Sequence, residues 1–266
     1  MVKVGINQPY YLPYVGFFER VKACDYFVVN PFTPLNRTRA FHRRTKIIQQ
    51  HRNAPQRFLY LTQCVSHLAE GKFFSDISLD ERFWERQQIH IKTIVSTYKR
   101  ARYFRLLDNL LRLMAEQSSD LGSYNTKLIK ETSEILGLSN KIIDASKDSK
   151  LLAIDFAEGN GEFANKATQI TFFICKKLGA TLHIAGQNGP LWLDETPFIK
   201  AGIGVLYQRI KFKAYPQFHR GDSFVPGLSA IDLIANNGLR SRRILGQNSD
   251  LVSREELLRT TKLTGR

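Results

Sequence analysis

The 266-residue sequence is poor in cysteine, with only Cys24, Cys64 and Cys175. These three are far apart, odd in number and without CxxC or other metal-ligand spacing, which argues against a disulfide framework and a cysteine-based zinc site. No apolar run reaches the length of a membrane span. The first residues lack the apolar core and the cleavage site of a secretory signal. We therefore expect a cytoplasmic protein with no transmembrane segment.

The common fingerprints of nucleotide, hydrolase and metal chemistry are also missing. The sequence has no GxGxxG, GxxxxGK[ST], GxSxG or HExxH motif, and no DxD of the kind that many glycosyltransferases use. The six histidines are scattered, and His183 stands in an apolar stretch typical of a buried strand. The sequence therefore predicts no metal site and leaves any cofactor unassigned.

Acidic residues are scarce, and none occurs between Tyr26 and Ala69, while the whole chain carries a net charge of +15. That acid-free segment contains a dense set of basic residues, namely Arg37, Arg39, Arg43, Arg44, Lys46, Arg52 and Arg57. Such a surface attracts anions: nucleic acid, acidic lipid headgroups, or the diphosphate of a nucleotide or nucleotide-sugar. A solvated basic face without a dedicated partner is the remaining alternative.

The hydrophobic pattern at the start of the chain indicates a strand at 2–7, a helix at 13–23 and a strand at 25–29. A strand–helix–strand unit of this kind predicts an α/β domain with a mainly parallel sheet flanked by helices. Residues 31–57 are typical of a long loop, in which we expect a short helix near Thr45–Gln50. Strands are predicted at 57–65 and, shorter, at 76–80.

Helical periodicity replaces this alternation at about 81–138, which predicts a helical insertion. Strand and helix patterns then alternate again, and a last helix begins at Ser229 as N-cap and ends at Gly238. We expect one α/β domain over residues 1–246, followed by a peripheral tail at 247–266.

The stretch GINQPYYLPYVGFFER interrupts the first strand–helix connection in an unusual way. Asn7 and Gln8 stand at the carboxyl end of the first strand, where open α/β sheets bind ligands. Pro9 disfavours helical backbone at Gln8. Amide groups suit a sugar hydroxyl or a base edge, and Tyr10 and Tyr11 offer stacking faces and hydroxyls. Alternatively, the stretch is a proline-rich turn whose tyrosines pack into the core.

Other candidate site residues lie near predicted strand ends or in the basic segment. Arg43 and Lys46 suit phosphate oxygens. The remaining candidates for substrate contact follow later strands or stand on the last helix: Gln187, Asp194, Tyr215, Gln217 and Asn236. Asp232, on the face of Ser229 and Asn236, is either a base that deprotonates an amine or a residue favoured by the helix dipole. We take Asp232 and Gln8 as the candidate catalytic residues.

Five ordered blocks resemble the WbqC-like family over residues 2–245. The block INQPYYLPYVGFFERVKACDYFVV is similar to that family's opening signature, His-Gln-Pro-x-Tyr-Leu-Pro-Trp-x-Gly-Phe-Phe. The others are HRRTKI, the FW pair at 83–84, IAGQNGPLWLDETPFIKAGIGVLYQRI and YPQFHRGDSFVPGLSAIDLIANNG. The family's histidine, tryptophan and Asp-Asp pair are replaced here by Asn7, Tyr14 and Asn30–Pro31. If that histidine or those carboxylates act as acid–base groups in the family, this chain works differently or not at all.

The resemblance implies a role in bacterial surface-glycan (O-antigen) biosynthesis. We expect a transferase that adds an aminoacyl or acyl group to the amino group of a nucleotide-linked sugar. Its second partner is the acyl or aminoacyl donor, and one version of this hypothesis has that donor bound to a carrier. The diphosphate of that sugar would account for the basic segment. The main alternative is a nucleic-acid-binding protein, although no RRM, helix-turn-helix or zinc signature is present, so we expect no specific nucleic acid. An ATP-dependent amide ligase is the second alternative.

Overall fold

The computed structural model describes residues 1–35, 42–49, 57–66, 69–155, 162–218 and 223–263. Its main sheet has the strand order β5-β2-β1-β6-β7-β8. The strands are β1 (Lys3–Asn7), β2 (Tyr26–Val29), β5 (Ile142–Asp144), β6 (Leu182–Ala185), β7 (Gly204–Ile210) and β8 (Ser249–Val252). The first five of these are parallel, and β8 runs antiparallel to β7. The predicted α/β class is confirmed.

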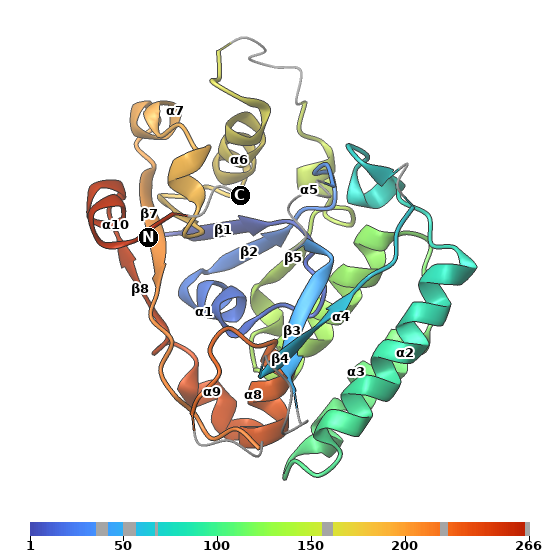
Figure 1. The fold of residues 1–266 in the computed structure, drawn as a ribbon. Coiled ribbons are helices and arrows are strands. Elements are labelled where there is room, and N and C mark those ends of the chain that lie inside the picture. Colours follow the sequence, from blue (N-terminus) through green and yellow to red (C-terminus); the bar gives the residue numbers. More distant parts are fainter. Residues whose placement is uncertain (36–41, 50–56, 67–68, 156–161, 219–222, 264–266) are drawn as a thin grey trace.

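Helices cover both faces of this sheet (Figure 1). On one face, Phe17 and Phe18 of α1 (Val15–Ala23) share a core with Phe27 of β2 and with α8 (Ala230–Asn237). On the other, Cys175 and Phe198 pack against Val4. The elements of that second layer are α6 (Lys166–Lys177) and α7 (Thr196–Lys200), and short helices occur at α5 (Ser149–Leu152), α9 (Ser241–Ile244) and α10 (Arg254–Thr260).

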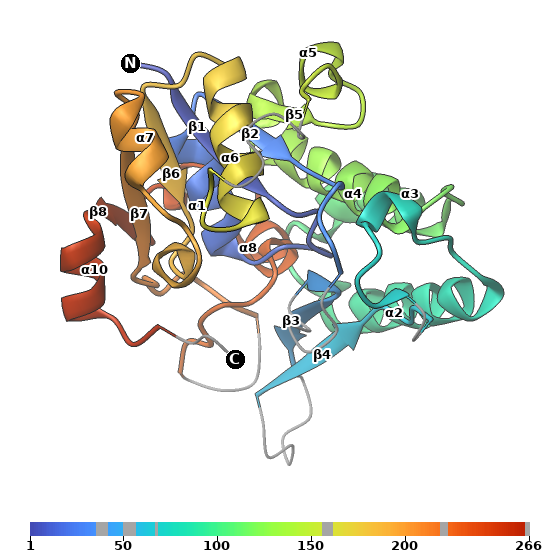
Figure 2. The same ribbon diagram turned by 90° about the horizontal axis from the view of Figure 1, so that it is seen from above.

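The predicted helical insertion is present as α2 (Glu81–Tyr98), α3 (Asp108–Ala115) and α4 (Leu121–Ile135), which lie together beside the sheet (Figure 2). Two aspartates start these helices as the N-cap rule predicts: Asp80 accepts from Phe83 N, and Asp120 accepts from Ser123 N. Among the described residues, no helix is both long and apolar enough to cross a membrane.

The prediction of a helix near Thr45–Gln50 is wrong. Residues Arg44–Ile48 form β3, which pairs antiparallel with β4 (Phe58–Thr62) in a separate two-stranded sheet. Thr45 and Ile47 are buried on one side of this ribbon, a period-two pattern that five residues alone do not distinguish from a helical turn. The short strand predicted at 76–80 is also absent, because this segment contains the 3₁₀ turn Phe74–Asp76 and a single bridge from Ser78 to Asp120.

Residues 247–266, expected as a peripheral tail, contribute an edge strand to the main sheet. Gln208 and Arg209 of β7 pair with Leu251 and Asp250 of β8. Leu257 of the following helix α10 is buried in the core of the α6 and α7 face. The segment therefore lies at the sheet edge but contributes to the core.

The connection from β1 to α1 is the point where the separate parts of the structure meet. The carbonyl of Leu12 accepts hydrogen bonds from Thr45 Oγ1 of β3 (2.7 Å) and from Ser229 Oγ before α8 (2.9 Å). The Pro9 carbonyl accepts from Asn125 Nδ2 of α4 (2.9 Å). Leu12 has a φ of 40°, and it is the one non-glycine among the described residues with positive φ. This strained backbone is held by contacts to three other elements.

Tyr11 extends the same connection to α2. It is 1% exposed, and its hydroxyl lies 2.8 Å from Gln87 Oε1 and 2.9 Å from His90 Nδ1. Burial lowers the pKa of His90 to about 4, so its ring is neutral. The Tyr11 hydroxyl donates its one proton to Gln87 Oε1, and its oxygen can accept the Nδ1–H proton of the His90 ring. Tyr11 is therefore a core residue. This agrees with the alternative that the opening stretch is a proline-rich turn whose tyrosines pack into the core.

We expect Tyr11→Phe to lower the free energy of unfolding by about 1–3 kcal/mol, because a buried ring nitrogen loses its hydrogen-bond partner. Urea unfolding followed by circular dichroism measures this change. The matched control is Tyr26→Phe, at a position that is 42% exposed, which should leave the unfolding midpoint unchanged. Equal midpoints for the two variants would contradict the assigned role of Tyr11.

Candidate functional site

The strand order reverses at β1. From β1 the chain proceeds to β2 and β5 on one side, and it later returns to β6 and β7 on the other. In open α/β sheets, ligands bind beyond the carboxyl ends of the strands near such a reversal. Hydrogen bonds join the carboxyl ends of β1, β2 and β5. Asn30 N, after β2, donates to Asn7 O of β1 (2.8 Å), and Ala145 N, after β5, donates to Val29 O of β2 (3.0 Å). This edge of the sheet is therefore the candidate site.

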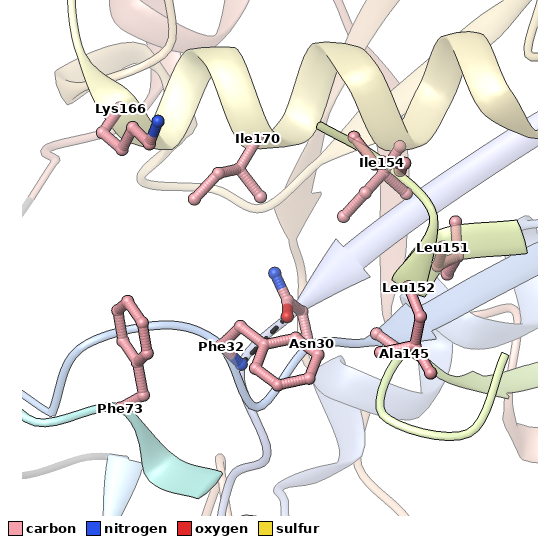
Figure 3. Close-up of a pocket in the computed structure, with 10 residues that line it drawn as sticks. Asn30, Phe32, Phe73, Ala145, Leu151, Leu152, Ile154, Lys166 and Ile170 are labelled. Carbon is pink, nitrogen blue, oxygen red and sulfur yellow. Dashed lines mark hydrogen bonds between the residues drawn. The ribbon is translucent and has the colours of Figure 1, made fainter. Parts of the chain in front are cut away.

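A cavity of about 360 Å³ lies at this edge, beyond β2 and β5 and under α6 (Figure 3). Its walls are mainly apolar side chains drawn from distant parts of the chain. They are Phe32, Phe73, Ala145, Leu151, Leu152, Ile154, Ile170 and Ile174, together with the polar residues Asn30 and Lys166. An apolar pocket with few polar groups is typical of sites for small molecules.

The two polar residues approach the cavity from opposite sides. Asn30 is 2% exposed, and its Oδ1 accepts from Phe32 N (3.0 Å), so that its Nδ2 is directed toward α6 (Figure 3). Lys166 is the first residue of α6, and Asn165 caps that helix by accepting from Thr168 N (2.8 Å). The cavity thus combines an amide donor, an ammonium group and an apolar wall.

The residues of the opening stretch lie next to this edge but do not all face it. Asn7 Oδ1 accepts from Arg20, and its Nδ2 donates to Gln8 O (2.9 Å). Gln8 is partly exposed, and none of the described hydrogen bonds involves its side-chain amide. The Tyr10 ring stacks on His42 at 5.2 Å. Of this group, Gln8 remains the candidate for ligand contact.

Four predicted site residues form one hydrogen-bonded network, two of them on α8. The Asp232 carboxylate is fully buried and accepts from Tyr215 Oη (3.0 Å), Gln217 Nε2 (3.2 Å) and Asn236 Nδ2 (3.3 Å). The Tyr98 hydroxyl is a further partner. Burial is the largest effect on this group and raises its pKa to about 6, although the hydrogen bonds act in the opposite direction. These contacts favour the structural alternative for Asp232.

The other predicted site residues make local contacts in separate places. Arg43 Nη1 donates to Gln63 O (3.0 Å), and the Lys46 ammonium lies 4.4 Å from the centre of the Phe58 ring. Gln187 Oε1 accepts from Ile210 N (3.0 Å), and Asp194 Oδ1 accepts from Thr196 N (2.9 Å). Three basic residues of the acid-free segment lie outside the described residues: Arg37, Arg39 and Arg52.

The lining of the cavity under α6, as far as the structure describes it, includes none of the twelve predicted site residues. Arg43 lines a second, more open cavity of about 540 Å³ between β4 and α2, together with Arg86, His90 and Cys64. Sequence reasoning missed Asn30 and Lys166. The strand-end rule that selected Asn7 applies equally to Asn30, which directly follows β2. Lys166 had no such signal, because lysine at a helix start is common on solvated surfaces.

Comparison with known proteins assigns the chain to a family. The model of the WbqC-like protein family matches residues 8–244. The chain belongs to this family. It is also similar to the uncharacterized protein Rv1507c of Mycobacterium tuberculosis, with 23% identity over 244 residues that cover 90% of this chain and 95% of that protein. No solved structure matches the chain significantly.

The burial of Asp232 predicts a characteristic pH dependence. Because its pKa is raised from 3.8 to about 6 in the folded state, the folded protein binds this proton more tightly than the unfolded chain. The stabilisation is complete below the unfolded value and is lost as the pH rises through about 6. We expect the wild type to lose about 2 kcal/mol relative to Asp232→Asn between about pH 4 and about pH 7.

Urea unfolding of both proteins at several pH values measures this difference, and taking the difference cancels the titration of all other groups. Parallel stability curves for the two proteins would show that Asp232 titrates at its ordinary value.

Proposed function

We propose that this protein is a transferase of bacterial surface-glycan (O-antigen) biosynthesis that acylates or aminoacylates the amino group of a nucleotide-linked amino sugar. The observation that carries the proposal is the cavity under α6, which joins an apolar wall to the Asn30 amide and the Lys166 ammonium at the carboxyl edge of the sheet. Membership of the WbqC-like family and the charge of +15 support it. An apolar wall suits an acyl group, and an ammonium suits a phosphate or carboxylate.

The reaction requires no change of oxidation state. The amine nitrogen of the sugar attacks the carbonyl carbon of a carrier-bound thioester or ester and forms the new C–N bond. The C–S or C–O bond to the carrier breaks, and the proton lost by the nitrogen is taken up by the departing sulfur or oxygen. During this step a partial negative charge develops on the carbonyl oxygen, which a fixed N–H donor stabilises.

The described residues fit these requirements in distinct ways. Asn30 Nδ2 is the donor for the carbonyl oxygen, because its own Oδ1 is held by Phe32 N. The walls formed by Leu151, Ile154 and Ile170 exclude water that would hydrolyse the donor. Lys166 binds an anionic group of the donor or of the sugar nucleotide. Gln8, beside the end of β1, positions the sugar.

The proposal is tested by incubating the purified protein with a panel of nucleotide-linked amino sugars and of acyl and aminoacyl thioesters. Mass spectrometry should detect a sugar nucleotide heavier by one acyl group, formed without ATP. Product that appears only with ATP would indicate an amide ligase instead. Binding of short DNA with no response to any sugar nucleotide would indicate a nucleic-acid-binding protein.

Lys166→Ala should reduce kcat/KM by about tenfold to a hundredfold, which corresponds to the loss of one charge-assisted hydrogen bond. Lys177→Ala is the matched control, since Lys177 is an exposed lysine at the opposite end of the same helix. This control should retain wild-type rates. Equal rates for both variants would remove the cavity from the proposed mechanism.

Gln8→Ala should reduce activity or sugar-nucleotide affinity by about tenfold while leaving Tm nearly unchanged, because its amide is partly exposed and contributes little to the core. Pro9→Ala should reproduce part of this defect, since it frees Gln8 to leave the extended backbone without removing a ligand contact. Calorimetric titration and thermal unfolding of both variants measure the two effects. Wild-type affinity in both variants would exclude Gln8 from the site.

A further inference from the structure

Arg20 of α1 is a buried guanidinium without a buried counter-charge. The residue is 6% exposed, and its Nε is buried without a hydrogen-bond partner. Its Nη2 donates to Asn7 Oδ1. Among the described residues, none of the ion pairs includes Arg20. Its Cζ lies 5.2 Å from the centre of the Phe27 ring. Burial of a charge that meets only an amide oxygen and a ring face is costly, and a bound anion reduces that cost.

The guanidinium lies at the reversal point of the strand order. Asn7, its partner, is the last residue of β1. Gly186 directly follows β6, and a Cβ placed on it would lie 2.7 Å from Arg20 Nη1. A side chain at this position would therefore shift the guanidinium. The two strands concerned, β1 and β6, are the neighbours between which the order reverses.

Further polar groups lie at the same edge. Asn188 follows Gly186 in a turn closed by the Gly189 N to Gly186 O bond (2.8 Å), and its Oδ1 is buried without a partner. Rotation of this amide by half a turn places an N–H donor at that position. Burial raises the pKa of the Tyr14 hydroxyl, and the positive charge of Arg20 acts in the opposite direction, which places the two groups within electrostatic reach.

Arginine suits this role better than lysine does. Its planar group carries five N–H donors, which match two oxygens of a phosphate or carboxylate. Asn7 takes one of these donors and fixes the orientation of the plane. The remaining donors include Nε and the Nη1 that faces Gly186, where a ligand meets no side chain.

We propose that the edge of the sheet at the carboxyl ends of β1 and β6 is an oxyanion-binding site in which Arg20 supplies the charge and Asn7 orients it. If the function proposed above is correct, the oxyanion is the diphosphate of the nucleotide-linked sugar, bound next to the cavity that takes the acyl group. The anion site itself stands on the burial and contacts of Arg20.

The first experiment measures binding of inorganic pyrophosphate to the full chain by isothermal titration calorimetry. Arg20→Lys should weaken binding by about tenfold, because an ammonium group cannot form the paired hydrogen bonds of a planar guanidinium. Arg20→Met should abolish binding. Arg243→Met, at an exposed arginine, is the control for adsorption to the basic surface and should bind as the wild type does. Equal binding by the wild type, Arg20→Met and Arg243→Met would overturn the proposal.

A second readout separates ligand binding from a structural role. Without ligand, Arg20→Met should be as stable as the wild type or more so, because it removes a buried charge that has no ionic partner among the described residues. Pyrophosphate should raise Tm of the wild type and not of the variant. An equal rise of Tm with pyrophosphate in the wild type and in Arg20→Met would refute the site.

Gly186→Ala tests the site with Arg20 in place, in case Arg20→Met fails to fold. The added methyl group should displace Nη1 and weaken pyrophosphate binding, and unchanged binding by this folded variant would refute the site. Acetate and nucleoside diphosphates identify the source of the anion: tighter binding of a nucleoside diphosphate than of pyrophosphate assigns a nucleotide, and preference for acetate assigns the carboxylate of a donor. Pyrophosphate binding without transferase activity would leave this site intact and refute the proposed function.

Discussion

The backbone of residues 9–15 constrains the rest of this structure. Its carbonyls accept hydrogen bonds from the two-stranded ribbon, from α4 and from the start of α8, while Tyr11 binds α2. Val15 N and Pro13 O also pair with Leu228 O and Ala230 N. Two prolines restrict the conformations open to this segment, which offsets part of the cost of the positive φ at Leu12. The segment therefore links the ribbon, α2, α4 and α8 to the sheet.

This constraint divides the roles of neighbouring residues. Tyr11 and Leu12 are directed into the core, so Asn7 and Gln8, which precede them at the end of β1, are the residues of this stretch that lie at the sheet edge. The opening stretch thus contains two kinds of residue. Tyr11 and Leu12 pack in the core, and the amides lie at the sheet edge beside Arg20 and Asn30.

Local sequence patterns predicted much of the fold, because strand–helix alternation and helix caps depend on residues close in the chain. The ribbon strand β3 was missed, since its pairing with β4 is non-local and five residues carry too weak a period. The site was harder to predict. Tyr11 reads as a ligand contact until its partners, Gln87 and His90, are seen more than 70 residues away. Likewise, the cavity brings Phe73, Leu151 and Ile170 together from three distant segments, and each is unremarkable alone.

The polar side chains at the ends of β1 and β2 have a chemical consequence for this edge of the sheet. Asn7 is the last residue of β1, and Asn30 directly follows β2. Amides hold orientation without titrating near neutral pH. Asp144, at the end of β5, is paired with Lys130 (3.3 Å) and accepts from Ser146 Oγ (2.6 Å), so its carboxylate is already engaged. The positive charge of Arg20 faces the Asn7 amide oxygen and the Phe27 ring. In the proposed reaction, such an edge favours anionic ligands and catalysis by orientation and electrostatics, with the reacting proton carried by the substrates themselves.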